Sequence, residues 1–554
     1  MNQLTTNLLR RSLLLSLIVM FLGSVTLTSA QDGGNTSESK ESITFHTTRK
    51  VGAKVQLSIN AKTPIKADGL KESIIADGAL HQYTLTKDKV TVNGDVTSFT
   101  CTFNEIDQLD ITKASSLDTL RCGKNILTTL DISKSSSLTN LDCWNNKITA
   151  LDLASCPQLI VVHCARNNIS ELDLSKSSSL EFLDCARNQI SRLDFSKTPK
   201  IRFIYCACNK IKATIMGRLI YSLPDRSQEE KKGEIHVIDS FFAKKFGDNV
   251  CLKKDALEAK RRGFKVFDFN APNPKKYEGS DPVYPAGETT LATALKVGDK
   301  VSLSITGEDN DDIMLEGLRE PFDPGAKEYT VEKATITIHG KLTELDCSKQ
   351  KVSSITVSAD HSLLKLNCSS NELTTLDLTK APRLLTLECQ GNKISEIKIA
   401  TASKLEKLSI YNNAIQEKAM SELIQALPDR KGQTAGLLYA ISKTSTTELN
   451  KCPDELIKVA KDKNWELKSN ESDNVSVEAP STLALRVYPN PAKEYVHVAG
   501  LSRGEVVALY SSQGQLLQRA TADDLGSVEL DLHRLPDGAY ILKSSSESTV
   551  LLVK

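Results

Sequence analysis

Apolar residues recur along residues 96–211 with a period of 21 residues. The stretch LTNLDCWNNKITALDLASCPQ, residues 138–158, is followed directly by LIVVHCARNNISELDLSKSSS and then by LEFLDCARNQISRLDFSKTPK. Apolar and polar residues alternate up to each cysteine, which predicts a short strand, and the asparagine three residues later indicates a turn. A unit of this length leaves little room for an α-helix on the return path, so extended or 3₁₀ segments are expected there.

The shared unit, L-x-x-L-x-C-x-x-N-x-I-x-x-L-D-L, resembles the leucine-rich repeat, L-x-x-L-x-L-x-x-N-x-L. Each repeat is then one coil of a solenoid, and its Leu, Ile and Cys side chains stack inward on those of the next coil. The same period returns at residues 342–415. The expected fold is mainly β with some α: two leucine-rich repeat solenoids with β N-caps and α/β C-caps, followed by a small β-sandwich tail.

The cysteines occupy one column of the repeat. A further step of 21 after the last of them reaches Ile410, so the site accepts an apolar group in place of a thiol. Adjacent strands lie about 4.8 Å apart, beyond the roughly 3.5–4.5 Å between Cβ atoms in a relaxed disulfide. We predict buried free thiols; a metal column is the alternative, without the paired Cys/His spacing of zinc sites. The column comprises Cys101, Cys122, Cys143, Cys164, Cys185 and Cys206, then Cys347, Cys368 and Cys389.

Asparagine and aspartate form two more columns. An amide can donate and accept at once, so the asparagines can satisfy backbone groups inside the turns. They are Asn104, Asn125, Asn146, Asn167, Asn188 and Asn209, then Asn371, Asn392 and Asn413. Gln350 replaces the first asparagine of the second array, and a less tight turn is expected there. The aspartates, Asp110, Asp131, Asp152, Asp173 and Asp194, are predicted to accept turn hydrogen bonds, with a calcium ladder as the alternative.

The architecture is duplicated. KVGAKVQLSI at 50–59 matches KVGDKVSLSI at 296–305, and MGRLIYSLPDR at 216–226 matches MSELIQALPDR at 420–430. The two offsets, 246 and 204, differ by 42, which is two whole repeats. Alternating segments before each array predict a β cap, and apolar spacing after it predicts a capping helix, followed by a strand, a second helix and a strand. Cys251 and Cys452 are equivalent cap positions, expected to be buried.

The first 30 residues have the pattern of a secretory signal. Arg10 and Arg11 precede the apolar run SLLLSLIVMFLGSVTL, and the small residues of TSA end at Ala30, which predicts cleavage before Gln31. A retained membrane anchor is the alternative, although the run is short for a span of about 20 residues. No other segment is long and apolar enough, so the mature chain is expected to have no transmembrane segment.

The tail, residues 485–554, contains short alternating strands joined by N-P and D-G turns, which predicts a small β-sandwich. It resembles the C-terminal sorting domain of the type IX secretion system through Tyr488-Pro489-Asn490-Pro491, the strand–Gln513-Gly514-Gln515–strand element, Gly538-Ala539-Tyr540 and the closing LLVK. The central element departs mildly from that family at Ser511 and Gln515. The resemblance implies contact with the type IX machinery, export to the outer-membrane surface or the medium, and removal of the tail, often with attachment to lipopolysaccharide.

The expected divisions are 1–30 signal peptide, 31–95 linker and β N-cap, 96–211 first array, 212–270 α/β C-cap, 271–290 linker, 291–341 second β N-cap, 342–415 second array, 416–468 second α/β C-cap, 469–484 linker and 485–554 sorting domain. A net charge of +1 argues against nucleic acid as a partner. The eight histidines form no local catalytic motif, so we expect no enzyme, no cofactor and no metal; distant residues could still converge into an active site.

The arrays resemble internalin-type bacterial surface proteins with a cysteine in the strand, which implies adhesion, host contact or biofilm formation. The partner is then a host or bacterial surface protein or glycan. A curved solenoid binds through its strand face, and in the first array this face carries residue types enriched at binding hot spots: Trp144, His163, Arg166, Phe182, Arg187, Phe203 and Tyr205. These side chains could instead pack against each other, and the chain could be a self-associating surface-layer component. The second face is more polar, so we expect it to be a spacer or weaker site.

Overall fold

The computed structural model describes residues 41–270, 274–358, 362–401, 403–443, 445–468 and, between 486 and 553, the tail strands with short flanking segments. The signal peptide, with Ala30 and Gln31, and the linker at 469–484 lie outside the described residues. The chain forms two compact units, Met1–Leu438 with Leu449–Glu466, and Tyr439–Glu448 with Leu467–Lys554. The finer division made from the sequence stays a prediction.

A small β cap opens the first array. Buried and half-buried residues alternate along β1, because one face of the strand covers the core. Strands β3-β5-β1-β7 form one antiparallel sheet, while β4, β2 and β6 begin the long sheet of the solenoid. The strands are β1 (Ser42–Thr47), β2 (Lys54–Ala61), β3 (Lys66–Asp68), β4 (His81–Thr84), β5 (Lys89–Asn93), β6 (Val96–Thr100) and β7 (Ile106–Lys113).

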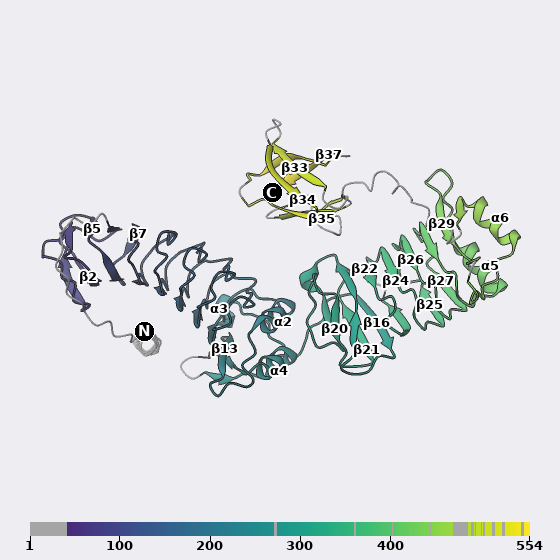
Figure 1. Ribbon diagram of the computed structural model, residues 1–554, viewed down its shortest axis with the longest axis horizontal. Coiled ribbons are helices and arrows are strands. Elements are labelled where there is room, and N and C mark those ends of the chain that lie inside the picture. The colour runs from purple at the N-terminus through teal and green to yellow at the C-terminus, as the bar shows by residue number, and fades with distance from the viewer. Residues whose placement is uncertain are drawn as a thin grey trace. The chain divides into compact units, whose positions relative to one another are not determined.

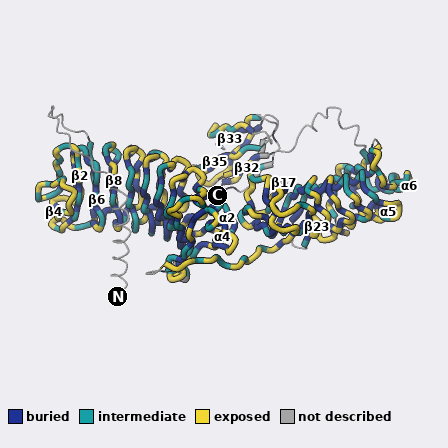
Figure 2. Tube along the Cα trace, turned by 60° about the horizontal axis from the view of Figure 1, so that its bottom comes forward, coloured by how far each residue is buried: buried dark blue, intermediate teal, exposed yellow. Residues whose placement is uncertain are grey.

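Each following coil adds one short parallel strand (Figure 1). Register is kept from coil to coil, since Leu120 pairs with Leu141 and Val162 with Leu183, and buried residues recur in every coil (Figure 2). The return path contains turns and extended segments, as predicted. The coil strands are β8 (Thr119–Arg121), β9 (Asn140–Asp142), β10 (Val161–His163), β11 (Phe182–Asp184) and β12 (Phe203–Tyr205).

The asparagine column closes the turns. Asn167 donates through Nδ2 to the carbonyl oxygens of Cys143 and Cys164, at 3.1 and 3.0 Å, and accepts from the Ile148 N–H at 3.0 Å. The residue before it, Arg166, has φ 58°, a left-handed conformation that is uncommon outside glycine. The amide bonds offset this strain by pairing buried backbone groups.

Gln350 keeps the same turn as its counterpart in the first array. Lys349 and Lys351 have φ 61° and 54°, against 62° and 55° for Phe103 and Glu105. The Gln350 Oε1 accepts the Ser302 N–H at 2.8 Å, just as the Asn104 Oδ1 accepts the N–H of the equivalent Gln56 at 2.9 Å. The prediction of a less tight turn was wrong, because the longer side chain makes the equivalent bond and the backbone angles are unchanged.

The aspartate column is confirmed as a set of turn acceptors. Asp152 Oδ1 accepts the Ala154 N–H at 2.8 Å. The same bond, to the amide two residues on, recurs at Asp110, Asp131, Asp173 and Asp194.

Helix α2 (Ala213–Ser222) covers the end of the first array, as its apolar spacing predicts, and buries Met216, Leu219 and Ile220. Strands β13 and β14 then extend the coil sheet in parallel, and β15 pairs antiparallel with β14. The remaining cap elements are β13 (Gly233–Ile238), α3 (Ala243–Phe246), α4 (Lys253–Arg261), β14 (Phe264–Asp268) and β15 (Lys275–Lys276).

The second module repeats the first, since its cap sheet β19-β21-β16-β23 has the same strand order as β3-β5-β1-β7. Cys452 is half-buried, so the expectation that it is buried like Cys251 was wrong; Cys251 lies against the carbonyl of Leu252 inside its cap. The elements are β16 (Glu288–Thr293), β17 (Lys300–Ser302), β18 (Ser304–Gly307), η1 (Asn310–Asp312), β19 (Met314–Glu316), β20 (Glu328–Thr330), β21 (Thr335–His339), β22 (Leu342–Asp346), β23 (Val352–Val357), β24 (Lys365–Asn367), β25 (Thr375–Leu378), β26 (Thr386–Glu388), β27 (Glu396–Ile399), β28 (Lys407–Ser409), α5 (Glu417–Ala426), β29 (Gly436–Tyr439), α6 (Asp454–Asp462) and β30 (Trp465–Leu467).

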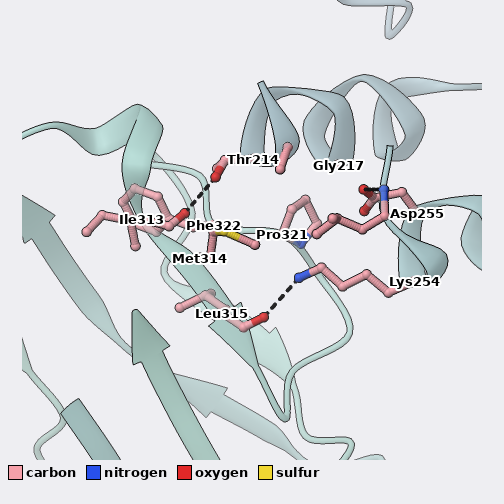
Figure 3. A pocket seen from close by; sticks show the side chains of 11 residues that line it. Thr214, Gly217, Lys254, Asp255, Ile313, Met314, Leu315, Pro321 and Phe322 are labelled. Carbon is pink, nitrogen blue, oxygen red and sulfur yellow. Dashed lines mark hydrogen bonds between the residues drawn. The ribbon is translucent and has the colours of Figure 1, made fainter. Parts of the chain in front are cut away.

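The first C-cap contacts the second N-cap directly (Figure 3). Thr214 Oγ1 donates to the Ile313 carbonyl at 2.9 Å, and Lys254 Nζ donates to the Leu315 carbonyl at 2.9 Å. A Cβ at Gly217 would lie 2.9 Å from the Cβ of Pro321, so only glycine permits this approach. The cavity left between the caps is about 10 Å³, too small to hold a ligand.

The tail forms two antiparallel sheets. Sheets β31-β32-β35 and β34-β33-β36-β37 share one core that includes Val496, Leu530, Leu509 and Leu542, which agrees with the predicted sandwich. The motif residues Pro489–Pro491, Gln513–Gln515 and Lys554 lie outside the described residues. The strands are β31 (Arg486–Tyr488), β32 (Tyr495–Ala499), β33 (Val506–Ser511), β34 (Leu516–Thr521), β35 (Ser527–Asp531), β36 (Gly538–Lys543) and β37 (Ser548–Val553).

Candidate binding face of the first array

The residue that precedes each ladder cysteine points away from the core, and the parallel register places these residues in one line across the sheet. We call this line the central column. Five of its members precede ladder cysteines and pair in sequence through the strand register: Arg121, Asp142, His163, Asp184 and Tyr205. His236 and Phe267 of the C-cap strands continue the same line. The column has a charged half over β8–β11 and an aromatic half over β12–β14.

His163 is the centre of the charged half. Its Nδ1 lies 3.5 Å from Asp142 Oδ1, and its Nε2 lies 3.1 Å from Asp184 Oδ2. Burial lowers the pKa of the His163 imidazole, but the two carboxylates together outweigh burial and hold that pKa above its usual value. Burial raises the pKa of Asp142. The three groups form a clamp that joins β9, β10 and β11 through one imidazole.

Trp144 lies beside this clamp. Its ring stacks on the His163 imidazole with centroids 6.0 Å apart and planes 5° apart, and its edge meets Phe103 at 6.4 Å. A Cβ at Gly123 would lie 2.3 Å from the indole, so the glycine of the preceding coil makes room for the ring. Trp144 is half-buried, which leaves part of a large apolar ring exposed to a partner.

The aromatic half is a stack. Tyr205 and His236 lie 4.2 Å apart, His236 and Phe267 lie 5.0 Å apart, and Phe269 contacts the first two edge-on. Burial lowers the pKa of His236 to about 4, so this ring is neutral near pH 7. Its Nδ1 is buried and makes no hydrogen bond to the described residues.

Phe182 and Arg187 do not present free surface. Phe182 is only 1% exposed, and its ring centroid lies 5.6 Å from that of Tyr205. The prediction that Phe182 contacts a ligand was therefore wrong, because side chains of the neighbouring coils cover it. Arg187 pairs with Asp239 at 3.2 Å and lies 3.7 Å over the Phe242 ring. Its guanidinium is therefore engaged by the C-cap.

The other predicted residues, Arg166, Phe203 and Tyr205, are half-buried on this face. Sequence reasoning missed Asp142 and Asp184, although both occupy the position before a ladder cysteine, where charge alternates from Arg121 through His163. The periodicity that located the cysteines could therefore have located the clamp.

On the strand face of the second array, charged side chains pair with one another. Glu344 pairs with Lys365 at 2.7 Å, Glu388 pairs with Lys407 at 2.7 Å, and Asn367 donates to Asp346 at 2.8 Å. Each of these contacts joins adjacent coils. Few charges on this face are left for a partner.

The ladder thiols are all free and buried. Burial raises the pKa of Cys164 and its neighbours in the column, so they stay protonated. Within the described ranges, no group of three or more His, Cys, Asp and Glu side chains has the arrangement to hold a metal ion. No helix in the part of the chain that the structure describes is long and apolar enough to cross a membrane.

Residues 486–554 match the family model of the secretion system C-terminal sorting domain. This confirms the resemblance of the tail and indicates export, with a surface or extracellular location. No curated protein matches the chain.

Several solved structures are similar to this chain, and three of them are described below. The functional domain of InlJ from Listeria monocytogenes, described as including a cysteine ladder, is 15% identical over 82% of this chain and 76% of that chain, with a TM-score of 0.22. The internalin inlF from Listeria monocytogenes is 14% identical over 67% and 86%, with a TM-score of 0.22. YopM from Yersinia enterocolitica is 14% identical over 64% of each chain, with a TM-score of 0.18. The leucine-rich repeat fold is assigned from the coil geometry described above.

Proposed function

We propose that this exported chain binds a protein or glycan on a host or bacterial surface through the central column of its first array and the half-exposed Trp144. Adhesion, host contact or biofilm formation is the expected outcome of that binding. The observation that carries the proposal is the clamp of His163 between Asp142 and Asp184 with Trp144 stacked on it.

A rigid base for aromatic anchors favours binding, because little conformational entropy is lost when a partner docks. Trp and Tyr side chains on such a base are the usual anchors of protein interfaces. His163 contacts two carboxylates and an indole rather than a hydroxyl or thiol nucleophile, so we assign this face to recognition and not to catalysis.

The second array is proposed as a spacer or weaker site, in keeping with its internally paired charges. The type IX machinery is the proposed partner of residues 485–554, and attachment to surface lipopolysaccharide after loss of the tail is the proposed anchoring step. Neither step involves the strand face.

The test compares Trp144→Ala/Tyr205→Ala with Tyr411→Ala, a half-buried aromatic of the second array. Phe182 is left intact because its substitution would open a cavity in the packed face. Saturation binding of the full mature chain to host extracellular proteins and to neighbouring bacteria is measured after circular dichroism has shown native folding. We expect at least about a tenfold loss for the double variant, since hot-spot truncations cost about 2 kcal/mol or more, and no change for the control.

Equal binding by both variants would refute the proposal. Saturable self-association of the wild-type chain in sedimentation, without binding to any surface, would favour the surface-layer alternative.

A further inference from the structure

A cavity of about 590 Å³ lies in the first C-cap; its lining includes Phe267 of the central column but no residue of the clamp. Its lining comes from the loop before β13, the end of α4, and β14 with β15. Five of the ten lining residues are cationic and none is acidic: Ser227, Lys232, Lys260, Arg261, Gly263, Phe264, Lys265, Val266, Phe267 and Lys276. In a chain of net charge +1, such a set is a local concentration of positive charge.

The carboxylates near these cations lie outside the cavity lining, and several of them pair with more than one cation. Glu278 pairs with both Lys260 and Lys276. Glu234 lies 3.7 Å from Lys265. Lys232 donates at 2.7 Å to the Ser227 carbonyl, and among the described residues no carboxylate pairs with it.

Arg261 shares its partners as well. It lies 3.4 Å from Glu258 and 3.6 Å from Glu332, but Glu258 also pairs with Arg262 and Glu332 with Arg319. Five cations thus face the cavity with fewer carboxylates behind them, and the surplus charge is positive.

The second C-cap supplies an internal comparison. The Arg226 and Gly233 amides bond to the carbonyls of Arg262 and Gly263, and the Arg430 and Gly436 amides bond in the same way to Lys463 and Asn464. This fixes the correspondence of the two caps. Lys232, Arg261 and Lys265 correspond to Ala435, Asp462 and Glu466.

The fold of the cap therefore does not require the positive charges. Gly233 packs against the Phe264 ring, and Gly436 packs against the Trp465 ring in the same way. A Cβ added at either glycine would lie only 2.4 or 2.6 Å from the respective ring, so neither position can carry a side chain. The scaffold is the same in both copies, while three cations are replaced in the second by one neutral residue and two carboxylates. We infer that the cavity of the first C-cap is a binding site for an acidic oligosaccharide that carries sulfate, phosphate or carboxylate groups.

The volume and the lining residues of the cavity favour an acidic oligosaccharide over other ligands. The volume lies within the range of about 300–1,000 Å³ typical of organic ligands, and is far larger than a lone ion needs. Lysine ammonium groups are compact charges on flexible stems, which suits several separated anionic groups. Apart from the Ser227 hydroxyl, the polar lining side chains are donors only, so the N–H groups of an acidic peptide would find few acceptors there.

The test uses calorimetric titration of the full mature chain with a chemically defined sulfated tetrasaccharide, its desulfated form, hexaglutamate and inorganic phosphate. The variant Lys232→Ala/Lys265→Glu introduces the residues of the second cap. The control Lys176→Ala/Lys197→Glu makes the same charge change at exposed coil positions. Lys276→Ala, at another exposed position, is an independent second variant. Native circular dichroism is checked for all three.

We expect the sulfated tetrasaccharide to bind in preference to the other probes. The cap variant should weaken that binding at least about tenfold at low ionic strength, with a shallower dependence on salt, because three unit charges change within contact distance. Lys276→Ala should weaken binding less, and the coil control should bind as the wild type does. Neither Trp144 nor Tyr205 lines the cavity, so Trp144→Ala/Tyr205→Ala should also bind the sulfated tetrasaccharide normally. The cavity can therefore fail or hold independently of the Trp144 and Tyr205 contacts of the proposed function. Equal affinity for cap variant and coil control, tighter binding of hexaglutamate, or binding of phosphate alone would overturn the assignment.

Discussion

Replacement of Asn167 by Ala should destabilise the first array far more than the same change at Asn168. The Asn167 side chain joins backbone groups of two coils: its strongest bonds are to the carbonyls of Cys143 and Cys164 and to the N–H of Ile148, with a longer contact to the Ala165 carbonyl at 3.5 Å. Asn168, its neighbour in the chain, is exposed and bonds to the Ile148 carbonyl through its backbone N–H, which alanine retains.

The expected loss of stability in Asn167→Ala follows from the backbone groups that lose a hydrogen-bond partner. The Cys143 carbonyl also accepts from Asn146, and the Cys164 carbonyl also accepts from Asn188, each at 3.0 Å. Loss of Asn167 therefore leaves both carbonyls with one bond and the buried Ile148 N–H with none. An unpaired buried amide costs about 1–3 kcal/mol and each lost bond about 0.5–1.5 kcal/mol, which gives about 2–6 kcal/mol. An exposed substitution such as Asn168→Ala changes stability by about 0.5 kcal/mol or less.

Urea denaturation of the mature chain, followed by far-ultraviolet circular dichroism, measures the difference, and hydrogen exchange at the Ile148 amide locates it. Coils of a solenoid can open separately, so the local exchange rate is the more direct measure. We expect a lower denaturation midpoint and faster Ile148 exchange in Asn167→Ala alone. If both variants unfold at the same urea concentration with the same Ile148 exchange, the asparagine column does not hold the coils together.

The ladder thiols should resist iodoacetamide at pH 8 in the native chain, because all of them are buried and burial raises the pKa of Cys164. Mass spectrometry should find half-buried Cys452 modified before Cys164; rapid native alkylation of Cys164 would contradict its burial. The pKa of His163 is raised in the folded chain, so the stability it adds is fully present below its unfolded value near 6.5 and is lost as pH rises through the folded pKa. The free energy of unfolding of wild type relative to His163→Gln, measured at pH 5.5 and 8.5, should therefore be larger at the lower pH, and a difference independent of pH would argue against the clamp.

The repeat period predicted the coils, the buried thiols and the asparagine and aspartate turns, because a solenoid coil is determined mainly by its own residues and its two neighbours. The exposure of a strand-face residue depends on the side chains of adjacent coils, and for this reason the burial of Phe182 was not predicted. Arg187 pairs with Asp239, 52 residues further on, a separation over which periodicity carries no information. The cavity of the first C-cap likewise joins a loop, a helix end and a strand.

The two modules separate the residues that maintain the fold from those that give each surface its chemistry. Helix α2 buries Met216 as α5 buries Met420, and these apolar positions agree because both helices close the same kind of core. On the outer face of the same helices, Arg218 donates at 2.7 Å to the Phe322 carbonyl at the junction, whereas its counterpart is Glu422. A glutamate cannot make that bond, so the second cap cannot dock a further N-cap in the same way. The two strand faces and the cavity of the first C-cap are therefore the places where the two modules differ in surface chemistry.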